Sequence, residues 1–81
     1  MKQEYVLLND LSPGERVKII GFYKDQPSYR NRLLAMGLTI GTEFTLVRVA
    51  PLGDPIEISV RGFSLILRKN EAKILKLERV T

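Results

Sequence analysis

Alternation of apolar and polar residues between Ile56 and Arg68 constrains the fold more than any other feature of this 81-residue sequence. If Arg61 and Gly62 form a two-residue hairpin turn, with Gly62 at positive φ, the flanking strands align in one register. That register pairs Val60 with Phe63, Ile58 with Leu65 and Ile56 with Leu67 on an apolar face, and Ser59 with Ser64 and Glu57 with Ile66 on the other. A slip of one residue would destroy this match, so the sequence predicts a β-hairpin.

Turn signals divide the rest of the chain into short elements. Ser12–Glu15 is typical of a type II turn, and Gly21 within the following strand is typical of a bulge. A short helix is expected from Pro27, favoured by Asp25 before it and ended by Gly37. This helix has one apolar stripe. A later helical turn, capped by Asn70, is expected over residues 69–72. The stripe consists of Tyr29, Leu33 and Met36. The expected strands span residues 15–23, 42–50, 56–61, 63–68 and 74–80.

Five short strands without long crossovers predict a mainly β protein with an antiparallel sheet. Such a sheet is stable in a small domain when it curls into a barrel that hides its edges. The size fits an SH3-like or OB-like antiparallel β-barrel with one inserted short α-helix. The length has room for a single domain, residues 1–81.

The absence of cysteine and histidine from the sequence narrows its chemistry. Disulfides, thiolate nucleophiles, Ser-His-Asp catalysis and the usual transition-metal sites all need one of these residues. No two carboxylates lie at a spacing that forces them together, and no phosphate-binding glycine motif occurs. We therefore expect no catalytic, cofactor or metal site. No apolar run approaches the 18 or so residues that span a bilayer, which favours a cytoplasmic location.

Nucleic-acid binding is a minor hypothesis. The net charge of +4 is spread evenly along the sequence, whereas nucleic-acid binders gather basic residues into a patch. The alternation directs Phe44 and Phe63 inward and places Tyr29 on the helix stripe, so only Tyr5 and Tyr23 are free to stack on bases.

A protein-binding surface is the favoured hypothesis. Ile66 is apolar on the polar face of the hairpin, and Leu52 lies at the tip of a loop stiffened by Pro51 and Pro55. The alternatives are that the N-terminal segment covers Ile66 and that Leu52 folds back onto the core. Arginines around such a patch could pair carboxylates of a partner bidentately. The candidate partner-binding residues are Leu52, Gly53, Asp54, Ile66, Arg48, Arg61 and Arg68.

Several segments of the chain resemble the FeoA family, ferrous iron transport protein A. The most specific is the stretch from Val47 to Ile56, and the resemblance covers about residues 7–78. Ile40 departs from the family pattern, which often has proline there. The other matching segments are Leu8–Glu15, Arg32–Leu38, Gly41–Glu43, Val60–Phe63 and Leu67–Ala72.

The resemblance implies an SH3-like barrel that serves as a cytoplasmic accessory to bacterial ferrous iron uptake, at the inner face of the membrane through its partner. The implied partner is FeoB, a membrane permease with a cytoplasmic GTP-binding domain, and the family is not known as an enzyme. We expect the barrel to bind and modulate this transporter through its surface and loops. The same fold occurs as the C-terminal module of iron-dependent transcriptional repressors, but no helix-turn-helix precedes it in this sequence.

Three alternatives stay open. Asp54, Glu57 or Glu43 could bind Fe²⁺ or another divalent metal weakly through carboxylate oxygens. The barrel could bind nucleic acid in a regulatory role, like the repressor module. Residual exposed apolar surface could lead to self-association.

Overall fold

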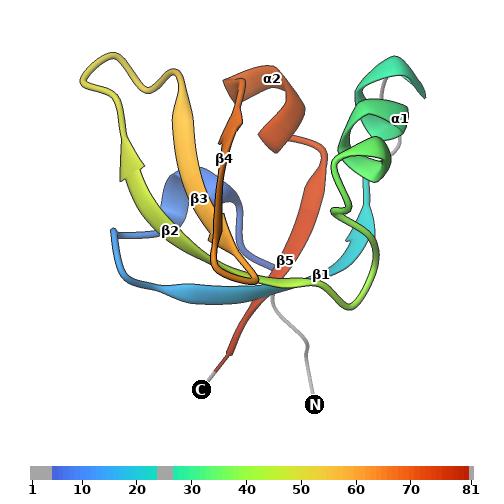
Figure 1. Ribbon diagram of the computed structural model, residues 1–81, viewed down its shortest axis with the longest axis horizontal. Helices are drawn as coiled ribbons and strands as arrows, with labels where there is room; N and C mark the ends of the chain where they lie inside the picture. Colours follow the sequence, from blue (N-terminus) through green and yellow to red (C-terminus); the bar gives the residue numbers. More distant parts are fainter. Residues whose placement is uncertain (1–4, 24–26, 81) are drawn as a thin grey trace.

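The computed structural model describes residues 5–23 and 27–80, and Asp25 lies outside this range. Its strands form one five-stranded antiparallel sheet in the order β4-β3-β2-β1-β5 (Figure 1). The strands are β1 (Arg16–Phe22), β2 (Glu43–Val49), β3 (Ile56–Val60), β4 (Phe63–Leu67) and β5 (Leu75–Arg79). The helices are the short 3-10 helix η1 (Leu8–Asp10), α1 (Pro27–Ala35) and the single turn α2 (Lys69–Ala72).

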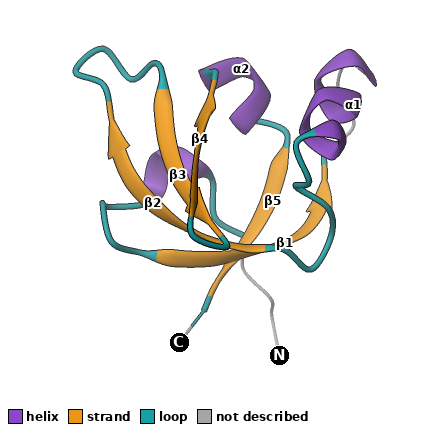
Figure 2. Cartoon of the chain, in the orientation of Figure 1, coloured by secondary structure: helices purple, strands orange, loops and turns teal. Residues whose placement is uncertain are grey.

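The sheet curls around a common interior, as Figure 2 shows, and this confirms a mainly β, SH3-like fold. The hydrogen-bonded ladder is not closed, because within the described residues β4 and β5 are its two edges and do not pair. The expected barrel is therefore open along one seam. Helix α1 follows β1, and α2 connects the two edge strands β4 and β5.

The predicted β-hairpin is confirmed with its register, since β3 and β4 pair from Ile56 with Leu67 to Val60 with Phe63. Arg61 (φ 51°) and Gly62 (φ 84°) both adopt positive φ, as a type I′ turn requires. The prediction that Phe63 points into the core is wrong, because its side chain is 72% exposed. It lies beside the turn, whereas Leu67 at the other end of the same strand is fully buried.

The hydrophobic core lies within the curl of the sheet. Leu33 is fully buried on α1, while Tyr29 and Met36 pack against the core, so the predicted helical stripe is confirmed. Gly37 has φ 86° after the helix, and the Leu38 N–H donates to Leu33 O at 3.0 Å, which ends α1 as predicted. Phe44 points into the core as predicted, and the largest fully buried side chains of the sheet are Phe44, Val17, Ile19, Leu46, Ile56, Ile58, Leu67, Leu75 and Leu77.

Gly21 marks an irregularity between β1 and β5, as predicted. The register shifts between Ile19 and Gly21, and the Lys76 side chain lies 3.4 Å from the position of an added Cβ at Gly21. An added Cβ would be in ordinary van der Waals contact with Lys76, so the glycine coincides with the irregularity but space does not exclude a larger residue.

Helix α2 is held by Glu71 and not by the predicted Asn70 cap. The buried Glu71 carboxylate accepts the Arg68 N–H at 3.0 Å through Oε1 and pairs with Arg32 Nε at 2.9 Å through Oε2. Arg32 belongs to α1, so this one side chain caps α2 and ties it to α1.

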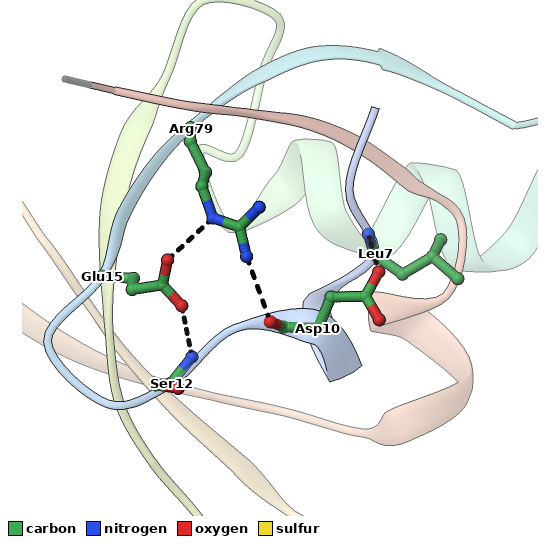
Figure 3. Close-up of polar contacts among 5 residues, drawn as sticks. All are labelled: Leu7, Asp10, Ser12, Glu15 and Arg79. Atoms are coloured by element: carbon green, nitrogen blue, oxygen red, sulfur yellow. Dashed lines mark hydrogen bonds and ion pairs between the residues drawn. The ribbon is translucent and has the colours of Figure 1, made fainter. Parts of the chain in front are cut away.

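The segment before β1 is fastened to β5 by polar contacts of Arg79 (Figure 3). Arg79 Nε donates to Glu15 Oε1 at 2.7 Å, and Nη2 donates to Asp10 O at 3.2 Å. Glu15 Oε2 also accepts the Ser12 N–H at 2.6 Å, and that hydrogen bond, followed by Arg79, lowers the pKa of Glu15. Closer to the N-terminus, the Val6 N–H donates to Leu77 O at 2.9 Å, so Val6 forms an isolated bridge with the outer edge of β5.

Candidate functional site

A row of three side chains crosses the outer face of the sheet, the face turned away from the core. The register pairs Arg48 of β2 with Glu57 of β3, and Glu57 with Ile66 of β4. Residues opposite one another on neighbouring strands project to the same side, so a cation, an anion and an apolar side chain lie next to each other.

Glu57 is the polar centre of this row. Its Oε1 accepts from Arg48 Nε at 2.9 Å, and its Oε2 accepts from Ser64 Oγ at 2.7 Å. The Ser64 hydrogen bond, followed by the Arg48 hydrogen bond, lowers the pKa of Glu57 below its ordinary value of 4.5. Both carboxylate oxygens are engaged, so Glu57 orders the outer face around Ile66.

Ile66 borders a shallow groove of about 280 Å³ next to the loop between β2 and β3. Its side chain is 55% exposed, and the described N-terminal residues lie along β5 instead, so the alternative that they cover Ile66 is wrong. The groove is lined by Arg48, Val49, Ala50, Pro51, Pro55, Glu57 and Ile66.

The loop between β2 and β3 holds Leu52 away from the protein. Leu52 is 92% exposed, so the alternative that it folds back onto the core is wrong. Hydrogen bonds fix the loop on both sides: the Gly53 N–H donates to Ala50 O at 2.7 Å, and Asp54 Oδ1 accepts the Lys69 N–H at 3.0 Å. Asp54 therefore has a structural contact with α2, and the loop presents Leu52 to solvent.

The three predicted arginines do not surround one patch. Arg48 lines the groove, but Arg61 lies at the far end of the hairpin, where its Nη1 is 3.8 Å from the position of an added Cβ at Gly37. Arg68 directly precedes α2 and contributes its N–H to Glu71. Val49, Pro51 and Pro55 also line the groove but were not predicted from the sequence. Their position next to Arg48 and Glu57 in the sequence could have indicated this.

The carboxylates considered as metal ligands are dispersed over separate contacts. Asp54 bonds to α2, Glu57 to Arg48 and Ser64, and Glu43 pairs with Arg16 at 2.9 Å. In residues 5–23 and 27–80, no group of three or more acidic side chains is placed to hold a metal ion. The carboxylates that the structure describes thus give no basis for a metal centre.

Tyr5 and Tyr23, expected to be free for stacking, share a cation. Lys76 Nζ lies 5.6 Å from the centre of the Tyr5 ring and 5.1 Å from that of Tyr23. These distances are within the range of cation–π attraction, so each ring already faces a basic side chain of the same protein.

Within the described ranges, none of the helices has the length and apolar character that a membrane span requires.

Acid is expected to weaken the outer face through Glu57. Because its pKa in the folded protein is lowered below 4.5, the ionised side chain contributes stability above that pH, and the contribution is lost as the pH falls through the folded pKa. Urea unfolding over an acidic pH series should show a shallower loss of stability below pH 4.5 for Glu57→Gln than for the wild type. Equal slopes would contradict this role of Glu57.

Comparison with known proteins adds to this geometry. A family model described as "FeoA domain" matches residues 6–79. The "Fe(2+) transport protein A/Fe(2+) transporter FeoB fusion protein" of Porphyromonas gingivalis is 28% identical over 74 residues, which cover 91% of this chain but only 9% of the fusion protein. The solved FeoA-like protein from Clostridium acetobutylicum has a TM-score of 0.85 and 37% identity, covering 100% of this chain and 92% of that chain. The FeoA protein from Chlorobium tepidum has a TM-score of 0.82 and 34% identity, and the match covers 94% of this chain and 71% of that chain.

Proposed function

Because this chain belongs to the FeoA domain family, we propose that it is a non-enzymatic accessory domain of ferrous iron uptake that binds a FeoB-type transporter. The observation that carries the proposal is the Porphyromonas gingivalis fusion protein, whose name joins an Fe(2+) transport protein A to FeoB in one polypeptide. Covalent linkage holds two domains at a high effective concentration, which benefits domains that work in contact. We propose the same association for this chain.

The outer face is the surface we assign to this binding. We define it as Arg48, Glu57, Ile66 and the loop residues Leu52–Asp54. Leu52 and Ile66 offer exposed apolar side chains that a partner could bury, and the Arg48–Glu57 pair supplies a polar rim. The loop is fixed at Gly53 and Asp54, so little conformational entropy would be lost when Leu52 is buried by a partner.

The partner is a soluble region of the transporter. The outer face mixes charged and apolar side chains, with Arg48 78% exposed beside the exposed Ile66, and such a surface suits a protein more than the hydrocarbon of a bilayer. We assign the cytoplasmic GTP-binding part of FeoB as the docking site, which places this domain at the inner face of the membrane through its partner.

Charged substitutions on the outer face are expected to weaken binding to the purified FeoB-type transporter of the same organism. Leu52→Asp and Ile66→Glu should each raise the Kd by about tenfold or more, since burying a carboxylate without a partner costs over 1 kcal/mol. Binding would be measured by biolayer interferometry with the transporter in lipid nanodiscs.

Ile40→Glu is the matched control for Ile66→Glu. Ile40 is 63% exposed, against 55% for Ile66, but it lies in the turn before β2 and away from the groove. This control should bind like the wild type. Normal binding by both Leu52→Asp and Ile66→Glu would show that the outer face is not the docking surface.

A further inference from the structure

Strand β4 has a free edge, whereas the corresponding edge of β5 is covered. The Val6 N–H bonds to Leu77 O, which places the N-terminal segment along β5. On β4, pairing with β3 uses only one side of the strand. No other strand in the described part of the chain pairs with β4, so its second side makes no ladder hydrogen bonds.

The hairpin register identifies the backbone groups on this free side. In a hairpin with a two-residue turn, the residues next to the turn form a hydrogen-bonded pair, and hydrogen-bonded and non-hydrogen-bonded pairs alternate from there. Phe63, Leu65 and Leu67 therefore direct their N–H and C=O groups toward β3. Ser64 and Ile66 direct theirs outward, so the edge offers two donors and two acceptors.

Strand β4 also lacks the features by which edge strands avoid pairing. Its sequence, Phe-Ser-Leu-Ile-Leu, contains no charged residue and no proline, and no bulge interrupts its ladder with β3. Phe63 is 72% and Ile66 55% exposed. An exposed, regular and apolar edge of this kind is a template for another strand.

We infer that the β4 edge binds an extended, acid-flanked segment of the transporter as an additional strand of the sheet; this inference rests on the proposed function. Basic side chains lie at both ends of the edge: Arg61 before β4, and Arg68 and Lys69 after it. None of these three has an ion-pair partner among residues 5–23 and 27–80. Acidic residues at the ends of the bound segment would be complementary to them, and an apolar residue opposite Ile66 would extend the row on the outer face.

The same charges disfavour a second copy of this chain as the occupant. Antiparallel pairing of β4 with its own copy about a two-fold axis would place Arg61 of one molecule near Arg68 and Lys69 of the other. Like charges facing each other across a strand pair are destabilising. The edge is therefore suited to an acidic partner more than to itself.

Hydrogen–deuterium exchange of the full chain, alone and with the intact transporter in nanodiscs, tests the inference at single amides. In the free chain, the Ser64 and Ile66 amides should exchange faster than those of Leu65 and Leu67. Binding should slow both by about tenfold or more, because each acquires a hydrogen bond to the added strand. Binding without slower exchange at Ser64 and Ile66 would overturn strand addition and leave the proposed function intact.

Two other outcomes would also overturn it. If the transporter does not bind the chain at all, the proposed function fails first and the strand inference fails with it. If the two amides become protected in the free chain as its concentration is raised, a second copy occupies the edge instead.

Substitution of Ser64 provides an independent measurement. Ser64→Pro removes an outward N–H without removing a bond to β3, and edge strands tolerate proline at such positions. Ser64→Ala keeps the N–H but loses the hydroxyl contact with Glu57. We expect Ser64→Pro to weaken transporter binding about tenfold and Ser64→Ala less than about threefold. Equal binding by both variants would contradict the inference, and if Ser64→Pro does not fold, the exchange measurement decides.

Discussion

Ile58→Ala should lower the free energy of unfolding by about 2–5 kcal/mol. Ile58 is fully buried on β3 and pairs with Leu46 of β2 and Leu65 of β4. Truncation would remove buried apolar surface and leave a cavity between three strands. A domain of this size has a total stability of only about 4–12 kcal/mol, so the variant would lose a large share of it.

Chemical unfolding in urea, followed by circular dichroism, measures this effect. Ile40→Ala is a suitable control, since Ile40 is 63% exposed and its truncation should change stability by less than about 0.5 kcal/mol. If Ile58→Ala is no more destabilising than Ile40→Ala, the core does not pass through the β2–β3–β4 layer as described.

Glu71→Ala is expected to cost about 1–3 kcal/mol, the second largest effect. The substitution removes the cap on the Arg68 N–H and the link to Arg32, and it loosens α2 from α1. The Glu71 side chain is 4% exposed, so water cannot readily replace the contacts that the substitution removes. The Arg32 side chain is 70% exposed, and solvation of its guanidinium reduces the free-energy cost of losing the ion pair.

Glu43→Ala separates this effect from the general loss of a surface ion pair. Glu43 pairs with Arg16 at the same distance, 2.9 Å, but the side chains are 36% and 61% exposed. Its removal should cost less than about 1 kcal/mol. Equal destabilisation of the two variants in urea unfolding would show that burial of Glu71 adds nothing to the link between the helices.

The hairpin could be predicted in residue-level detail because its determinants are local. The two-residue side-chain period and the Arg61-Gly62 turn admit one register with the apolar side chains together. The exposure of an individual residue is different, because it depends on which other parts of the folded chain lie next to it. Phe63 obeys the alternation and still lies largely in solvent beside the turn, while Leu67, on the same face of the same strand, is fully buried.

The arrangement of the outer face could be predicted in part, and distance along the strand separates the predicted arginines. Ile66 and Arg48 could be found because an apolar residue interrupts a polar face and a cation lies two strands away in the register. Arg61 and Arg68 lie at opposite ends of a five-residue strand that spans roughly 17 Å, so of the three arginines only Arg48 lines the groove. The hydrogen bond from the Lys69 N–H to Asp54 joins segments 15 residues apart, so no local sequence pattern could predict it.

The most direct test of the account measures ferrous iron uptake in cells that lack this chain and are complemented with wild type, Ile66→Glu or Ile40→Glu at equal protein levels. The account predicts that wild type and Ile40→Glu restore uptake of radiolabelled Fe²⁺, while Ile66→Glu fails although it folds normally. Full restoration by Ile66→Glu would contradict the central claim that the outer face binds the transporter.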